Sequence, residues 1–293
     1  MRNKSLLFVM LLGFVTVSAQ ISDFARVEYK LLPRGSSNFG YSRIRVAANY
    51  PIELKNSNYL LVGLDYSNIE MSFDSDIVKF DTNIIQDFQM LEFNLAYIKK
   101  LKNDWRLGVR FTPGFSSNLG SKITFEDAVF AGDVVFINDK RDDTTIDKPY
   151  RLIVGVSYSQ NRGISFPLPF ISYYRKFHPK WSYNLGVPKS NLQYHISPKS
   201  RLKLVTELDG FTANIQEGLP VNNEEDLAKK INVSLILGGL RYEYKIKKHL
   251  EFFCNFSGVL MESAELRNKS NDKVSTVDKK NTIYFGTGIR IKK

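Results

Sequence analysis

The sequence predicts an all-β protein, an antiparallel up-and-down transmembrane β-barrel. Three observations support this fold class: an export signal at the start of the chain, many short segments in which apolar and polar residues alternate, and connections that are alternately short and long. A period of two belongs to a strand whose faces meet different media. Fourteen strands fit best and twelve is the alternative, because a barrel with both chain ends in the periplasm needs an even number.

Residues 1–19 are predicted to be a cleaved signal peptide. Basic residues precede an apolar run from Leu6 to Val17, and a small residue, Ala19, lies at the expected cleavage site. The run is too short and wrongly flanked for a membrane anchor. Residues 20–293 are therefore expected to form a single barrel domain in the outer membrane of a Gram-negative bacterium.

Composition narrows the class of protein further. Beyond residue 20 the chain has no run of 18 or more apolar residues, which excludes a helical membrane protein. Cys254 is the only cysteine, so no internal disulfide can form. Tyr and Phe, 15 and 21 in number, greatly exceed the two Trp, a balance that suits strands and aromatic girdles.

The net charge of +11 would ordinarily indicate a nucleic-acid partner. We expect none, because the chain is exported and its basic residues are spread along it. The expected partners are outer-membrane lipid and lipopolysaccharide, with the barrel assembly machinery during biogenesis. The sequence does not indicate an oligomeric state.

The predicted strands follow from alternation, with weaker signals at four of them. In the segment 231–246 the alternation changes phase: apolar positions are odd-numbered before Gly238-Gly239 and even-numbered after this pair. This change predicts a β-bulge at the two glycines. The fourteen segments are 24–31, 43–50, 60–67, 91–97, 105–111, 122–137, 152–158, 168–177, 181–188, 191–197, 202–208, 231–246, 250–260 and 281–291.

The connections assign a side of the membrane to each strand end. Outer-membrane barrels have short periplasmic turns and long external loops. The connection Asp139–Lys148 is longer than expected for a periplasmic turn. It is the observation that argues most strongly against this assignment of strand ends to the two sides. The short connections are Leu101–Asn103, His178–Lys180, Ser197–Ser200 and Lys247–His249, and the long ones are Ser72–Asp87, Asn214–Lys230 and Ala264–Lys280.

Nothing in the sequence favours catalysis, a cofactor or a metal site. The three histidines, His178, His195 and His249, are all predicted beside periplasmic turns. A barrel enzyme acting on outer-leaflet lipid needs its base near the outer rim, beside a nucleophile. Acidic residues in the loop after residue 138 lack the glycine pattern of a calcium loop. The protein is therefore predicted not to be an enzyme.

The strongest polar cluster lies on the predicted lumen face. It allows two interpretations: cross-strand ion pairs such as Glu28 with Arg43, or Lys245 with Glu251, that fill a narrow lumen, and a hydrated passage that favours anionic solutes. Closure of the barrel is expected to bring the last strand beside the first. The residues predicted to line the lumen are Arg26, Glu28, Arg43, Arg45, Arg110 and Arg290.

The function predicted from these features is an outer-membrane structural barrel or passive channel for small solutes, including anionic ones. Two alternatives remain open. A barrel enzyme acting on lipid would need a Ser or Asp beside a histidine inside the wall. A soluble periplasmic β-sandwich binding protein would bury the outward apolar rows in a core instead.

Several stretches also resemble a known family. Residues 23–29, 43–45, 49–51 and 59–66, with 154–158 and 167–169 in similar placement, resemble an uncharacterised family of Bacteroidota outer-membrane β-barrel proteins. The resemblance implies the location and the fold, and it carries over no functional residue. The final strand departs from the common aromatic ending of such barrels, because Ile291 is followed by two lysines.

Overall fold

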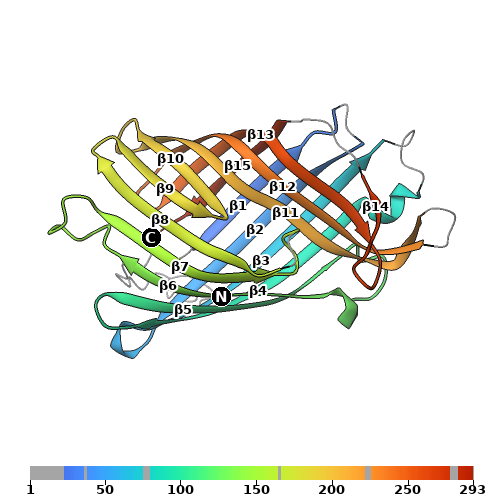
Figure 1. Ribbon diagram of the computed structural model, residues 1–293, viewed down its shortest axis with the longest axis horizontal. Coiled ribbons are helices and arrows are strands. Elements are labelled where there is room, and N and C mark those ends of the chain that lie inside the picture. Colours follow the sequence, from blue (N-terminus) through green and yellow to red (C-terminus); the bar gives the residue numbers. More distant parts are fainter. Residues whose placement is uncertain are drawn as a thin grey trace, which may run out of the picture.

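Antiparallel pairing of neighbouring segments closes the sheet into a ring of fourteen strands (Figure 1). The computed structural model describes residues 23–35, 38–74, 80–163, 166–221, 226–277 and 283–292, so the predicted signal peptide lies outside the described residues. The strands of the ring are β1 (Ala25–Leu32), β2 (Phe39–Glu53), β3 (Tyr59–Phe73), β4 (Asp87–Lys100), β5 (Trp105–Ser117), β6 (Ala128–Asp139), β7 (Tyr150–Ser159), β8 (Leu168–His178), β9 (Trp181–Val187), β10 (Lys189–His195), β11 (Ser200–Val221), β12 (Asp226–Lys245), β13 (Leu250–Arg267) and β15 (Ile283–Ile291).

Three short 3-10 turns and one additional strand complete the described secondary structure. The turns are η2 (Lys55–Ser57), η3 (Thr82–Ile85) and η4 (Phe125–Asp127), and the strand β14 (Lys273–Thr276) pairs with β13 outside the ring. None of the helical segments in the described part of the chain is long and apolar enough to cross a membrane.

The ring closes where the first strand meets the last. β15 pairs with both β1 and β13, and in this seam Arg26 is directly opposite Arg290. Each strand of the ring is thereby hydrogen-bonded to two neighbours, as a sheet surrounded by lipid requires. The predicted fold class and the favoured strand number are confirmed, and the β-sandwich alternative is wrong because one continuous sheet forms the whole wall.

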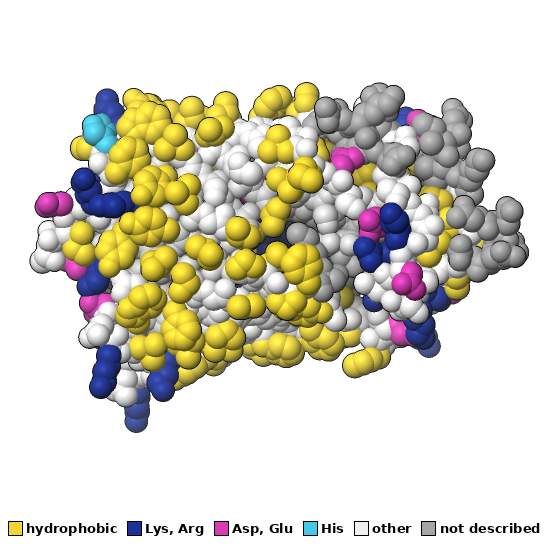
Figure 2. Space-filling view, in the orientation of Figure 1, with side chains coloured by type: hydrophobic (Ala, Val, Ile, Leu, Met, Phe, Trp, Pro, Cys, Tyr) yellow, Lys and Arg dark blue, Asp and Glu magenta, His cyan; other side chains and the backbone are white. Residues whose placement is uncertain are grey.

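An apolar belt surrounds the barrel. Outward side chains such as Val27, Ile44, Phe93 and Phe111 are exposed. Figure 2 shows hydrophobic side chains over the left and middle of the molecule, with basic side chains along the left edge. That edge carries the short turns (Figure 1). This is the outward band expected for a membrane-spanning barrel, with the short turns on the periplasmic side.

Strands occupy much of two of the predicted long loops. β11 runs to Val221 and β12 begins at Asp226, so most of the predicted loop Asn214–Lys230 is a hairpin that projects beyond the belt. β13 and β14 replace much of the predicted loop Ala264–Lys280 in the same way. Polar residues suggested loops here because the outer face of these extensions meets water rather than lipid.

The interior face changes its chemistry along the barrel axis. Near the short turns it is charged, whereas at the opposite end it is filled by a buried apolar cluster, which we call the external core. The external core consists of Leu32, Phe39, Tyr41, Ile69, Met71, Ile85, Phe88, Met90, Phe211, Ala213, Ile215, Leu219, Val221, Ala228, Ile231, Val233, Leu235, Leu237, Val259, Ala264, Leu266, Val277 and Tyr284.

The external core explains why the apolar positions of the predicted strand 231–246 change from odd-numbered to even-numbered residues. Odd-numbered residues of β12 face inward throughout, first as apolar Val233 and Leu237 and then as charged Glu243. β12 therefore stays in phase, and the bulge predicted at Gly238-Gly239 is misplaced. The extra residue is Leu260 of the neighbouring β13, because Ile236 pairs with Met261 and Leu237 pairs with Val259.

The wall narrows at its external end. β8, β9 and β10 end below the extensions of β11, β12 and β13 (Figure 1). Beyond that level β11 meets β5 in parallel, with Asn214 opposite Ser117. Ser116 Oγ donates a 2.7 Å hydrogen bond to the carbonyl of Thr212 at the same place. The narrower ring, made of β1–β5, β11–β13 and β15, encloses the external core.

Candidate functional site

The charged part of the interior brings together the residues predicted to line the lumen. At the seam, the like charges of Arg26 and Arg290 face each other, and each is neutralised separately. Arg26 Nε donates to Asp23 at 2.9 Å, and Arg290 Nε donates to Glu251 at 2.8 Å. A second nitrogen of Arg290 donates to Glu243 at 2.8 Å. Charge-assisted hydrogen bonds of this kind fix the guanidinium planes.

The predicted pair of Glu28 with Arg43 does not form. Glu28 is in register with Arg45 instead, and Arg43 donates two hydrogen bonds to Ser67 Oγ, at 3.1 and 2.9 Å. Arg45 Nε donates to Asp65 at 2.9 Å. Alternation predicts that these residues face inward, but it does not determine the offset between neighbouring strands.

Arg110 lies on the other side of the interior. It forms an ion pair with Asp133 on the neighbouring β6. The other predicted pair, Lys245 with Glu251, is in register. However, the cations that contact Glu251 in the described structure are Arg201, Arg290 and Lys292.

A buried aromatic ring joins three of the interior arginines. The ring centroid of Phe253 lies 4.2 Å from the guanidinium carbon of Arg241, 5.3 Å from that of Arg290 and 5.6 Å from that of Arg26. Such contacts favour a cation over the ring face. Sequence reasoning missed Phe253, although its odd number within 250–260 placed it on the charged face.

Basic side chains outnumber acidic ones on the charged interior face. The excess gives the interior a positive potential, which favours small anions over cations. The basic residues are Arg26, Lys30, Arg43, Arg45, Arg106, Arg110, Lys189, Arg201, Lys203, Arg241 and Arg290, and the acidic residues are Glu28, Asp65, Glu92, Asp133, Glu207, Asp209, Glu243 and Glu251.

The external core closes the passage above these charges. Phe211 of β11 packs edge-on against Tyr41, with ring centroids 5.5 Å apart, and lies 6.2 Å from the ring of Phe88. All three side chains are buried. Since a packed apolar interior excludes water, this end of the barrel is shut in the present conformation.

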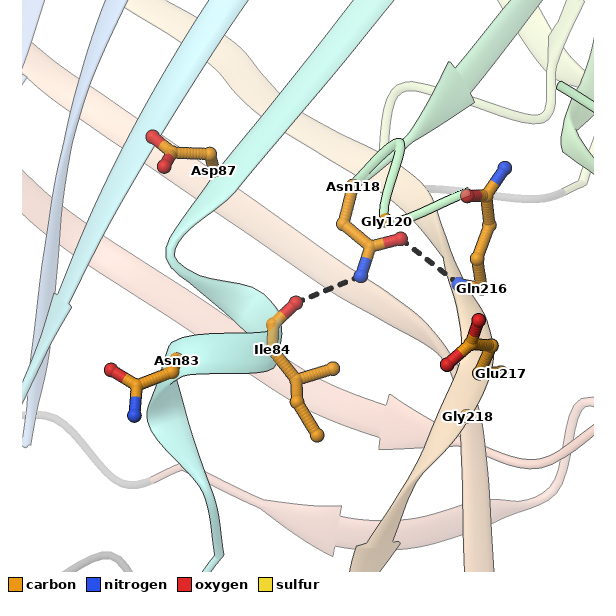
Figure 3. Close-up of a pocket in the computed structure, with 8 residues that line it drawn as sticks. All are labelled: Asn83, Ile84, Asp87, Asn118, Gly120, Gln216, Glu217 and Gly218. Carbon is orange, nitrogen blue, oxygen red and sulfur yellow. Dashed lines mark hydrogen bonds between the residues drawn. The ribbon is translucent and has the colours of Figure 1, made fainter. Parts of the chain in front are cut away.

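Hydrogen bonds hold β11 against the end of β5 outside the core. A pocket of about 260 Å³ lies at this junction. Figure 3 shows it between the β3–β4 connection and a kink of β11 at Glu217 and Gly218. Asn118 Nδ2 donates to the carbonyl of Ile84 at 2.8 Å, and the backbone N–H of Gln216 donates to Asn118 Oδ1 at 2.9 Å. The pocket is therefore bounded by interactions that keep the external end closed.

Asp127 of η4 completes this junction. Its carboxylate accepts hydrogen bonds from the Thr124 amide at 2.9 Å, Asn214 Nδ2 at 3.0 Å and Gln216 Nε2 at 2.7 Å. Burial alone would raise the pKa of Asp127, but these hydrogen bonds outweigh it and lower the pKa below its usual value. Sequence reasoning missed the junction because it treated residues after 213 as a loop.

The histidines lie beside the short turns, and one of them contacts a serine inside the wall. Ser182 Oγ and His195 Nε2 are 2.9 Å apart. Ser182 is 0% exposed, so no substrate can reach it. Among the charged groups, the cations Lys176, Arg201 and Lys203 act most strongly on His195, whereas a carboxylate orients the histidine of a catalytic triad.

Among the described residues, no group of three or more His, Cys, Asp or Glu side chains could hold a metal ion.

The closed ring, the outward apolar belt and the short turns at one end define the class: the fold resembles that of outer-membrane β-barrel proteins. The chain belongs to the family described as "Domain of unknown function (DUF6268)", whose model matches residues 37–292. A family of unknown function is what the sequence resemblance implied.

A comparison with curated protein sequences found no match. Similar solved structures include a KdgM porin in complex with disordered oligogalacturonate, at 8% identity and TM-score 0.37, covering 91% of this chain and 98% of that chain. A NanC porin has 9% identity and TM-score 0.36, with 92% and 100% covered. Outer membrane phospholipase A from Escherichia coli has 9% identity and TM-score 0.35, with 95% and 94% covered. Similarities this distant carry no argument about function.

Proposed function

We propose that the protein is a passive channel of the outer membrane for small solutes, anionic ones in particular, and that it is shut at its external end in the present conformation. One observation carries this proposal: the same interior face is charged near the periplasmic turns and packed with apolar side chains near the external end. The charged part provides the selectivity and the external core provides the closure.

Water reaches the charged part of the interior. The side chains of Arg45 and Arg110 face inward, yet 30% and 35% of their surfaces are exposed. Lys189 on β10 is exposed to the same extent as Arg110. Side chains that fill a lumen completely would have no such exposure, so a hydrated compartment supports a channel.

A structural barrel is the second candidate, and the ion-pair network supports it. Glu243 contacts Arg201 at 2.8 Å, Lys203 at 2.9 Å and Arg290 at 2.8 Å. A network of this density stiffens one side of the wall. A structural barrel would remain closed to ions even when a substitution loosens the external core.

Conductance separates the two candidates. We expect the purified protein to show little conductance in planar bilayers, and Phe211→Ala to open anion-selective conductance by loosening the external core. Phe111→Ala removes an equally large ring from the lipid-facing side and is the matched control, expected to leave conductance unchanged. A Phe211→Ala protein that migrates as a folded, heat-modifiable barrel but stays silent would support the structural barrel instead.

The barrel enzyme is disfavoured by the inaccessible Ser182 and by the basic surroundings of His195. We therefore propose a protein without enzymatic activity. A test is hydrolysis of phospholipid vesicles by the purified barrel: activity that disappears in His195→Ala would overturn this part of the proposal.

The proposed location is the outer membrane of a Gram-negative bacterium of the Bacteroidota, reached by cleavage of the signal peptide 1–19. The apolar belt supports contact with lipid and lipopolysaccharide, and an exported barrel requires the assembly machinery. N-terminal sequencing of protein from purified outer membranes should begin at Gln20. Recovery in the soluble fraction would contradict this location.

A further inference from the structure

A loop of the closed barrel carries a cation into the hydrated interior. Residues 160–163 follow β7 and lie against β11 and β12. The Thr212 amide donates to the carbonyl of Asn161 at 3.2 Å, and Ser234 Oγ donates to the carbonyl of Gly163 at 2.7 Å. The Gly163 amide donates in turn to Thr212 Oγ1 at 3.2 Å. The backbone on both sides of Arg162 is therefore fixed.

Gly163 makes this close approach possible. Its φ of +79° is left-handed, and an added Cβ would lie 2.3 Å from the carbonyl oxygen of Val233. Only glycine combines this backbone conformation with this contact. The loop is thus built to hold its neighbour, Arg162, in one place.

Arg162 faces charges from four strands. Its electrostatic neighbours are Arg110, Glu92, Asp133 and Arg45, all of which are on inward-facing positions. Arg162 is nevertheless exposed, so water occupies the space around its side chain.

Three of these neighbours are already neutralised. Arg45 is paired with Asp65, and Arg110 is paired with Asp133. Among the described residues, Arg162 and Glu92 form neither an ion pair nor a hydrogen bond. One free cation and one free carboxylate therefore face the same hydrated space.

We propose that Arg162 and Glu92 form the two ends of a binding site for a zwitterionic solute, namely a free amino acid or a short peptide. The solute carboxylate binds the Arg162 guanidinium in its bidentate geometry, and the solute ammonium binds the Glu92 carboxylate. A solute with only a carboxylate gains the first contact but is repelled by Glu92.

Polar neighbours at the same level suit such a solute. Asn94 is the next inward-facing residue after Glu92 on β4. Its side-chain oxygen Oδ1 accepts a 3.2 Å hydrogen bond from Thr112 Oγ1. This leaves the Asn94 amide nitrogen available as a donor toward the interior. An additional acidic group on the solute would be attracted by the positive potential of the interior, where basic side chains outnumber acidic ones.

This inference deepens the proposed channel function by naming a solute class, but its test does not depend on conductance. Calorimetric titration of the detergent-solubilised full barrel would compare L-serine with N-acetyl-L-serine, which lacks the ammonium, and ethanolamine, which lacks the carboxylate. We expect L-serine to bind and each single-charge probe to bind at least about tenfold more weakly.

Variants separate the two ends of the site. Arg162→Gln and Glu92→Gln should each weaken L-serine binding by about tenfold. The double swap Arg162→Glu with Glu92→Arg should recover part of the affinity, because the zwitterion can bind in the reverse orientation. Lys269→Gln and Glu126→Gln, an exposed external pair, are the matched controls.

The outcomes are distinct. Equal binding of L-serine and N-acetyl-L-serine, with no effect of Glu92→Gln, would show a simple anion site and overturn the zwitterion proposal. Absence of L-serine binding at millimolar concentration to a barrel that is folded by heat-modifiable migration would also overturn it. Binding without conductance in the Phe211→Ala protein would refute the channel but leave this site intact.

Discussion

Lys30 and Asp209 form an ion pair across the inside of the barrel, with Lys30 Nζ 2.8 Å from Asp209 Oδ2. Lys30 is on β1 and Asp209 on β11, and three strands of the wall separate them. The pair lies directly below the external core, because Leu32 and Phe211 are the next inward residues on the two strands. Tyr284 of the external core also donates its hydroxyl to Asp209. This contact marks the level at which the interior changes from charged to apolar.

We expect Asp209→Asn to destabilise the barrel by about 3 kcal/mol, because it leaves the ammonium of Lys30 without its counter-ion. The two side chains are only 12% and 13% exposed, so solvent cannot replace the lost partner. Equilibrium unfolding in urea from lipid vesicles would measure the change. The exposed pair of Lys269 and Glu126 provides the control, since Lys269→Gln should leave stability unchanged.

The number and order of the strands could be predicted because lipid keeps one face uniformly apolar along the membrane-spanning part of each strand. The interior could not be predicted in the same way. In β12, Leu235 and Leu237 face the external core whereas Leu240 faces lipid, and a periodic pattern does not distinguish these two apolar surroundings. Arg162 was missed for a different reason: it is in a loop, where alternation gives no direction to a side chain.

Deletion of Leu260 should be tolerated. Removing this extra residue would make Val259 and Met261 adjacent, so β13 would pair with β12 in one continuous register without moving Val259 or Ala264 from the interior. Leu260 is largely exposed, so little packing is lost. We expect the deletion variant to show normal heat-modifiable migration.

Deletion of Phe256 is the comparison for this experiment. It lies in a regular part of β13, so its loss would move Ser257 and Val259 to the opposite face. We expect this variant not to assemble. If both deletions were equally harmful, the register shift at Leu260 would not be the reason that β13 changes phase.

The junction between η4 and β11 should loosen in acid. The folded pKa of Asp127 is below its ordinary value of 3.8, so its ionised form stabilises the folded junction. This contribution is fully present above pH 3.8 and is lost as the pH falls through the lowered folded value. Limited proteolysis by an acid-active protease should therefore cut near residue 125 increasingly as the pH is lowered through this range.

Asp127→Asn should remove most of that pH dependence, because the amide cannot ionise and presents a donor to the Asn214 and Gln216 amides. The variant should be cut readily even at neutral pH. Cleavage with an unchanged pH profile would assign the acid response to another carboxylate.

Gly163→Ala should disturb the loop that holds Arg162 while leaving the ring of strands in place. The new Cβ would collide with the carbonyl of Val233, and the left-handed backbone at this position adds about 1–2 kcal/mol of strain for a residue other than glycine. We expect weaker L-serine binding, by a factor comparable to that of Arg162→Gln, together with normal heat-modifiable migration. Gly120→Ala is the matched control, because its Cβ would have 3.9 Å of clearance from the nearest heavy atom, Nδ2 of Asn118. Equal binding by the Gly163→Ala and Gly120→Ala proteins would show that the loop does not position Arg162.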